Sequence, residues 1–197
     1  QSPIDIVAKD AKSNDELKAI KFAYSDTDAN IVNNGHTIQF NVSGDNKVTI
    51  GDKEYKLLQW HYHAGSEHTV DGKQYPLAVH YVHKNSDTDY AVLGVMYEEG
   101  AENALLAKYM KDFPAKKGEK KGEGKIDLMS LLPKNKDYFN YKGSLTTPPC
   151  SEVVNWHLLK TPVTASKEQL ESFAKMLDGN YRPVMPLEGR EVSSFGG

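Results

Sequence analysis

Three histidines occur at positions that a single β-hairpin can bring together. His61 and His63 lie in a segment that reads as a strand, and His80 lies in the next such segment along the chain. Residues two apart on a strand point to the same face, so His61 and His63 share one face. The dipeptide Asp71-Gly72 between the two segments is a strong signal for a two-residue hairpin turn. All three imidazoles can therefore lie on one side of one hairpin.

The register of this hairpin decides which histidines face each other. If Val70 pairs with Lys73, His63 lies directly opposite His80, and directly opposed residues share a face. A bulge within residues 65–68 would change that register. Three neutral imidazoles leave a tetrahedral metal its fourth position open, which is typical of a catalytic zinc. The pattern predicts a Zn²⁺ site, although any one of these histidines alone would be taken as an ordinary strand residue.

The hydrophobic pattern predicts a mainly β fold in a single domain over residues 1–197, a usual length for an undivided all-β fold. Residues 37–42 and 47–50 alternate apolar and polar around a Gly44-containing turn, which predicts a hairpin with one buried face. Residues 77–82 and 90–97 are more continuously apolar than the other segments, as expected of central strands.

Helical and loop signals are few. Residues 166–177 carry an apolar stripe with a cap at Ser166, and residues 103–110 form a second candidate helix. Residues 115–125 are rich in Lys, Glu and Gly, which predicts a mobile surface loop. A docking role for its lysines is the less favoured interpretation, because the mixed charges dilute any basic patch.

Net charge excludes one class of partner. The formal net charge is −3 and no long basic face is present, which argues against nucleic acid as a partner. No apolar run is long enough to cross a bilayer. The chain begins at Gln1 without a methionine or a signal peptide, so we expect that a preceding N-terminal segment is missing.

Long motifs along the whole chain resemble the α-class carbonic anhydrases, and more closely the bacterial branch. These motifs follow one another in the family's order: Gln1–Ile6, Asn33–His36, Gln59–His63, Gly65–Gly72, Gly143–Cys150 and Asn180–Pro183. The resemblance implies a large, twisted, mostly antiparallel central sheet with a few short surface helices. It also implies a cleft with zinc at its base.

The implied reaction is the reversible hydration of carbon dioxide to bicarbonate and a proton. Zinc held by neutral ligands lowers the pKa of bound water to about 7, a value known from carbonic anhydrase itself. The hydroxide can then attack carbon dioxide, and a histidine can carry the proton away. The expected partners are carbon dioxide, bicarbonate, and sulfonamide and anion inhibitors.

The resemblance also assigns residues around the metal. Thr146 matches a threonine that accepts a hydrogen bond from zinc hydroxide and passes its own proton to a glutamate, which matches Glu67. Thr147 borders the same space, and His36 matches the proton shuttle. Taken alone, each of these residues would be interpreted as an ordinary loop or surface residue.

An apolar wall beside the metal is expected because carbon dioxide carries no charge. The predicted register places Val82 opposite His61, on the metal face. Val92 and Leu145 match the family's other wall positions, and Trp156 resembles a further residue of the pocket. Core packing is the alternative role for each, and the two roles are compatible.

Partners that orient the ligands can be predicted for two of the three histidines. Gln59 shares the metal face and can accept the ring N–H of His61. The family resemblance implies that the backbone carbonyl of Asn180 accepts that of His63. The family places a glutamate two residues before the third ligand, where this chain has Ala78. We therefore expect His80 to be held less firmly than in relatives with the glutamate.

Cys150 is the only cysteine in the chain. Bacterial relatives often pair a cysteine here with one in the segment before Gln-Ser-Pro, which implies a periplasmic or secreted origin. The sequence leaves a homodimer open.

Two other functions compete with carbon dioxide hydration. One is a non-catalytic binding module on the same fold, but such relatives typically lose a zinc ligand, and this chain keeps all three. The other is a zinc esterase that uses the same hydroxide. The narrow apolar wall favours a small linear substrate over an ester.

Overall fold

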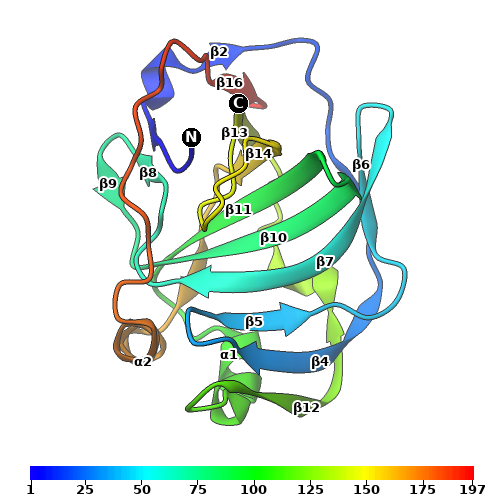
Figure 1. Ribbon diagram of the computed structural model, residues 1–197, viewed down its shortest axis with the longest axis vertical. Helices are drawn as coiled ribbons and strands as arrows, with labels where there is room; N and C mark the ends of the chain where they lie inside the picture. Colours follow the sequence, from blue (N-terminus) through cyan, green and yellow to red (C-terminus); the bar gives the residue numbers. More distant parts are fainter.

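A twisted sheet of β-strands runs through the protein in the computed structural model, which describes residues 1–197 (Figure 1). Its strand order is β12-β4-β5-β7-β10-β11-β14-β13-β16-β2, with β6 paired to β7 and β3, and β15 paired to β11. Most pairs are antiparallel, while β11 pairs in parallel with β14 and β15, and β16 with β2. A small second sheet contains β1, β8 and β9. The predicted fold class is confirmed.

The strands are Asp5–Ile6 (β1), Lys12–Ser13 (β2), Lys21–Ala23 (β3), Asp26–Asn33 (β4), Ile38–Asn41 (β5), Lys47–Ile50 (β6), Lys53–His63 (β7), Thr69–Val70 (β8), Lys73–Gln74 (β9), Leu77–Ser86 (β10), Asp89–Glu99 (β11), Gly118–Asp127 (β12), Tyr138–Gly143 (β13), Val154–Leu159 (β14), Val163–Ala165 (β15) and Ser193–Phe195 (β16). The α-helices are Ala104–Tyr109 (α1) and Lys167–Leu177 (α2). Short 3₁₀ helices cover Ala8–Asp10, Met110–Asp112 and Leu128–Leu131.

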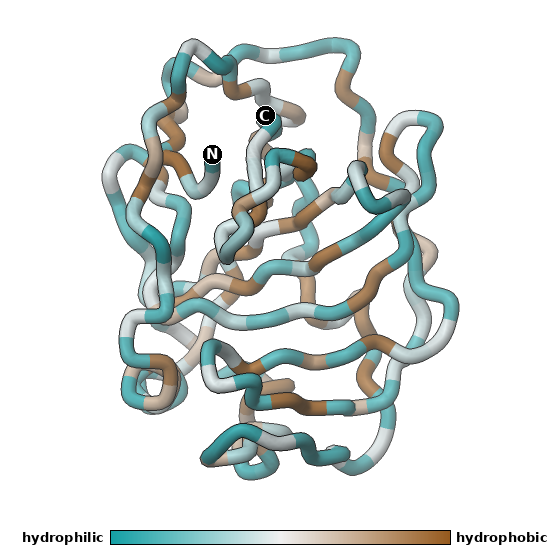
Figure 2. The backbone as a smooth tube through the Cα atoms, in the orientation of Figure 1, coloured by the Kyte–Doolittle hydropathy of each residue, from teal (hydrophilic) through white to brown (hydrophobic).

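The alternation of side chains along β7 and β10 separates the main core from the site. Trp60 and Tyr62 of β7 and Tyr81 of β10 are fully buried in the larger apolar cluster, which α2 joins through Phe173. The intervening residues point to the opposite face, because successive strand residues alternate. Figure 2 shows apolar and polar stretches on the strands of the sheet, coloured by hydropathy. A second, smaller apolar cluster lies on the histidine face.

Both predicted helices are present, and the predicted cap at Ser166 is confirmed. Ser166 accepts a hydrogen bond from the backbone N–H of Gln169, whose side chain returns one to the Ser166 N–H, forming a capping box. Asn103 caps α1 by accepting from Leu106 N–H. Neither helix has the length and apolar character needed to cross a membrane.

The predicted hairpin of residues 37–42 and 47–50 is wrong. Strands β5 and β6 do not pair with each other; both run antiparallel to β7, end to end along one of its edges. The segment between them leaves the ladder and is held by the buried Asn46, whose side chain accepts from Ser25 N–H and donates to the Ser43 carbonyl. Strand β7 is long enough to pair with both β5 and β6, so the two segments do not need to pair with each other.

The predicted mobile loop at residues 115–125 is also wrong. Residues 118–127 form β12, the edge strand paired antiparallel with β4. Its backbone gains hydrogen bonds from β4, while its charged side chains stay exposed and protect the sheet edge from further pairing. Gly122 of this strand is buried, and a side chain at this position would collide with the ring of Tyr109.

Candidate metal centre

The register of β7 and β10 brings the three histidines to one face. His61 lies directly opposite His80, and Ala78 lies opposite His63. The predicted pairing of His63 with His80 is therefore wrong, although the turn itself pairs Val70 with Lys73 as expected.

The error comes from residues that leave the sheet before the turn. Five residues separate His63 from Thr69, whereas three separate Gln74 from Ala78, so the register moves by two. An even shift preserves the face of every side chain. The sequence argument therefore predicted the correct face from an incorrect pairing.

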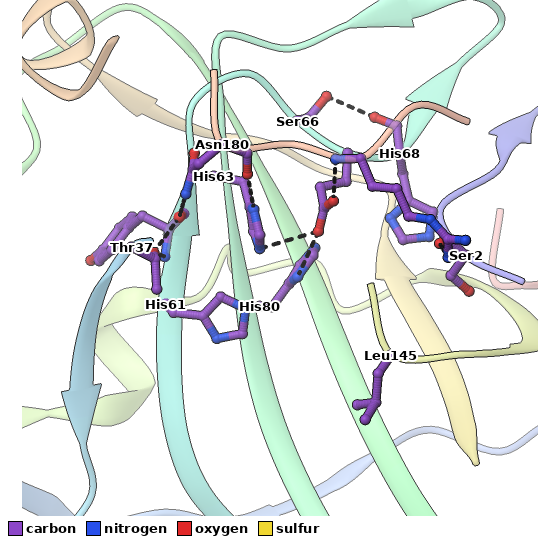
Figure 3. A network of polar contacts seen from close by, with 12 residues as sticks. Ser2, Thr37, His61, His63, Ser66, His68, His80, Leu145 and Asn180 are labelled. Atoms are coloured by element: carbon purple, nitrogen blue, oxygen red, sulfur yellow. Dashed lines mark hydrogen bonds and ion pairs between the residues drawn. The ribbon is translucent and has the colours of Figure 1, made fainter. Parts of the chain in front are cut away.

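The three imidazoles converge closely enough to bind one metal ion. Their ligand atoms all lie within 4.8 Å of one another. The ring centroids are 5.0 Å apart for His61 and His63, 5.4 Å for His61 and His80, and 4.6 Å for His63 and His80. Figure 3 shows the three rings meeting from two neighbouring strands. Three nitrogen donors at this spacing fit a tetrahedral ion with one open position.

Carbonyl acceptors orient two of the rings. The side-chain oxygen of Gln59 lies 2.8 Å from His61 Nδ1, and the backbone oxygen of Asn180 lies 2.7 Å from His63 Nδ1. Both predicted contacts are present. A carbonyl only accepts, so each Nδ1 donates its proton and each Nε2 keeps a lone pair directed at the cluster.

Burial keeps His61 and His80 in the form that binds metal. Loss of hydration, with a smaller contribution from His63, lowers the pKa of His61 to about 3. Loss of hydration also lowers the pKa of His80 well below its ordinary value, with help from the neighbouring histidines. Neutral imidazoles have free lone pairs at neutral pH, so no proton must be displaced for metal to bind.

Glu67 is buried beside the cluster. Its Oε2 accepts a hydrogen bond from the Arg182 backbone N–H at 2.7 Å, and its Oε1 lies 3.2 Å from His63 Nε2. Both Oε1 and His63 Nε2 are buried without a hydrogen-bond partner. Because His63 donates from Nδ1, two lone pairs face each other here, and a cation at this point would satisfy both. The residues present therefore fit a metal ion.

The expected hydrogen bond between Thr146 and Glu67 is not in the structure. Glu67 is instead held by the Arg182 N–H and faces the imidazoles. Thr146 and Thr147 nevertheless line the same cleft as Glu67. Their proposed roles depend on this proximity.

A cleft of about 990 Å³ opens over the cluster. Its lining is mainly polar and includes His36, His61, His63, Gln59 and Glu67. His36 is exposed in the bend before β5. An open polar cleft can hold a chain of water molecules between the cluster and solvent.

The predicted wall residues lie together beside the cluster. Val82, Val92 and Trp156 belong to the smaller apolar cluster, with Leu145 packed against it. The Trp156 ring centroid is 4.8 Å from that of His80. Val82 lies opposite Gln59 rather than His61 because of the two-residue shift in register. The four form an apolar layer beside the imidazoles, and none of them lines the open polar cleft.

Sequence reasoning missed contacts that join distant segments. The side chain of Asn180 accepts from Ala64 N–H and donates to the carbonyls of His36 and Tyr62. Arg182 holds Glu67 through its backbone and the carbonyl of Ser2 through its guanidinium. Both residues lie in the Asn180–Pro183 motif, but periodicity gives no signal for such long-range contacts.

Comparisons with known proteins agree with this centre. Residues 1–195 match the eukaryotic-type carbonic anhydrase family. A carbonic anhydrase of Pectobacterium carotovorum is 41% identical over 194 residues, covering 98% of this chain and 78% of the relative. One from Klebsiella pneumoniae is 43% identical over 196 residues, with the same coverage.

Solved structures show the same fold. The α-carbonic anhydrase of Thermovibrio ammonificans, in complex with the inhibitor sulfanilamide, has a TM-score of 0.93 and 45% identity, covering 98% of this chain and 86% of that chain. A hyperthermostable carbonic anhydrase from a hydrothermal vent chimney has a TM-score of 0.93 and 40% identity, covering 100% and 87%.

The chain therefore belongs to the α, or eukaryotic-type, carbonic anhydrase family. The family and enzyme class expected from the motifs are confirmed.

Proposed function

We propose that this protein catalyses the reversible hydration of carbon dioxide to bicarbonate and a proton, with Zn²⁺ held by His61, His63 and His80. The convergence of three imidazole nitrogens beneath a cleft, in a chain of this family, carries the proposal. When bound by three neutral ligands, zinc supplies a water whose pKa is about 7, a value established for carbonic anhydrase itself.

The chain's own residues hold and aim the ligands. Gln59 and the Asn180 carbonyl accept the Nδ1 protons of His61 and His63, so both rings keep one orientation. This orientation needs no reorganisation during turnover.

Residues of the cleft handle substrate and solvent. Thr146 and Glu67 would orient the attacking oxygen, and Thr147 would border the bicarbonate formed. The apolar layer of Val82, Val92, Leu145 and Trp156 would accept carbon dioxide, because an uncharged linear molecule gains little from polar partners.

His36 would transfer the product proton to buffer. It is exposed and lines the cleft that contains His61 and His63. Histidine is the side chain whose ordinary pKa is closest to neutral, so it can accept and release a proton without a large uphill step. The bend that carries His36 is held by Asn34 and Asn180.

Stopped-flow carbon dioxide hydration on zinc-loaded protein, with metal analysis of the same sample, tests this proposal. We expect one zinc per chain, rapid hydration, and inhibition by a simple aromatic sulfonamide. Stoichiometric zinc without carbon dioxide hydration would contradict the proposed activity and favour a non-catalytic binding module. Ester hydrolysis without carbon dioxide hydration would favour an esterase.

A further inference from the structure

The ring of His80 differs from those of the other two proposed ligands because it has no protein hydrogen-bond partner. Its Nδ1 lies 3.9 Å from Glu67 Oε1, the oxygen that also faces His63, so Nδ1 is directed at the metal cluster. Binding through Nδ1 leaves the proton on Nε2, and His80 is only 3% exposed. No protein group accepts this N–H, and a ring so little exposed to solvent is stabilised by an acceptor within the protein.

His68 is a buried imidazole next to His80, and one of its ring nitrogens lacks a hydrogen-bond partner. Its ring centroid lies 6.1 Å from that of His80, at a steep interplanar angle of 74°. Both rings pack on Trp156, at 4.6 Å for His68 and 4.8 Å for His80. His68 Nδ1 is buried and has no hydrogen-bond partner.

A hydrogen-bonded chain determines which nitrogen of His68 carries the proton. The Tyr141 hydroxyl donates to Ser2 Oγ at 2.7 Å, and Ser2 Oγ also accepts from the Ser144 N–H at 3.0 Å. Because the hydroxyl hydrogen of Tyr141 points to Ser2, the 2.6 Å contact between Tyr141 and His68 Nε2 is made by a proton on Nε2. In a neutral ring, Nδ1 is then an acceptor.

We propose that His68 is a positioning residue for His80: its unprotonated Nδ1 accepts the Nε2 proton of His80, directly or through one water. This inference rests on the proposed zinc site. The centroid separation allows a direct bond after a small side-chain shift, or a bridged one with the rings where they are. The series of hydrogen bonds from Ser2 through Tyr141 to His68 would then extend to His80. Figure 3 shows Ser2, His68 and His80 in this region.

The first test is the tautomer of His68 in zinc-loaded, ¹⁵N-histidine-labelled protein, read from two-bond ¹H–¹⁵N correlations. We expect His68 to be protonated at Nε2 only and His80 at Nε2. A proton on His68 Nδ1 overturns the proposal, because His68 would then be a second donor. Metal analysis of the same sample separates this outcome from failure of the zinc site itself, which would show as protein without zinc.

The second test measures the zinc dissociation constant by competition with a chelator. His68→Phe keeps a ring against Trp156 but removes the acceptor, and we expect affinity to fall roughly tenfold or more, a range known partly from carbonic anhydrase itself. His157→Phe is the matched control, because His157 is equally buried with an unpartnered Nδ1 but lies outside the cluster. An unchanged dissociation constant in folded His68→Phe overturns the proposal.

A third variant distinguishes positioning from general loosening. Position 78 is two residues before His80 on the same face of β10, so Ala78→Glu would supply a carboxylate acceptor. We expect this change to restore most of the lost affinity in His68→Phe and to change the parent much less. Equal gains in both backgrounds would overturn the proposal, since they would show that His80 lacks an acceptor in the parent.

Discussion

His61 lies directly opposite His80 across strands β7 and β10. The same register places Gln59, which orients His61, opposite Val82 of the apolar layer. One strand pair thus positions all three proposed ligands, an orienting amide and a wall residue. His63 lies at the end of β7, where Asn180 contacts it from the C-terminal segment.

Removing one proposed ligand should empty the site. We expect His80→Ala to lose most of its zinc and most of its hydration activity, because two imidazoles cannot complete the coordination that a catalytic zinc requires. Metal analysis and stopped-flow hydration measure both effects. His157→Ala, which also removes a buried histidine, should keep one zinc per chain. Stoichiometric zinc and normal hydration in His80→Ala would refute the ligand assignment.

His36→Ala should slow proton release without changing the chemical step. We expect kcat to fall while kcat/KM stays nearly constant, because His36 is exposed at the cleft and outside the histidine cluster. Added imidazole buffer should restore much of kcat. Steady-state hydration over a range of buffer concentrations measures this. A parallel fall in both parameters, with no rescue, would show that His36 has another role.

Asn180→Ala should weaken metal binding although it leaves the backbone carbonyl that contacts His63. The lost side chain ties together Ala64, Tyr62 and the His36 bend, so the carbonyl would no longer be held in place. We expect the zinc dissociation constant to rise roughly tenfold in a chelator competition. Asn103→Ala, which removes the cap of α1, should lower stability without this effect. Equal affinities for Asn180→Ala and the parent would contradict the prediction.

His83 should make the protein less stable in acid. Burial lowers the pKa of His83 to about 4, despite its contacts with the carbonyls of Tyr81 and Ala91. The unfolded chain, with a histidine pKa near 6.5, therefore binds the proton first as pH falls. The stabilisation is complete above pH 6.5 and is lost between about pH 6.5 and 4, by about 2–3 kcal/mol.

Urea unfolding of metal-free parent and His83→Gln at pH 7.5 and 4.5 checks this prediction. The free energy of unfolding should fall by about 2–3 kcal/mol more in the parent, because glutamine does not titrate in this range. The same fall in both proteins would mean that other groups set the acid limit.

Local patterns along the chain were enough to predict much of the protein. Strand alternation placed His61, His63 and His80 on one face, and the cap at Ser166 marked the start of α2. These predictions succeed because side-chain direction and helix capping depend on neighbours within a few residues. The family itself was evident from motifs that need no structure to be read.

Only the tertiary structure decided which segments pair and which buried groups meet. Strand β7 is long enough to pair with both β5 and β6, and β4 orders the charged strand β12 at the sheet edge. Two extra residues after His63 moved the register, and a change of that kind depends on how the chain leaves the sheet. The contacts from Asn180 to Ala64 and from Tyr141 to His68 join residues far apart in sequence. Such contacts form because buried polar groups must find partners wherever the fold brings them, and local sequence does not record that choice.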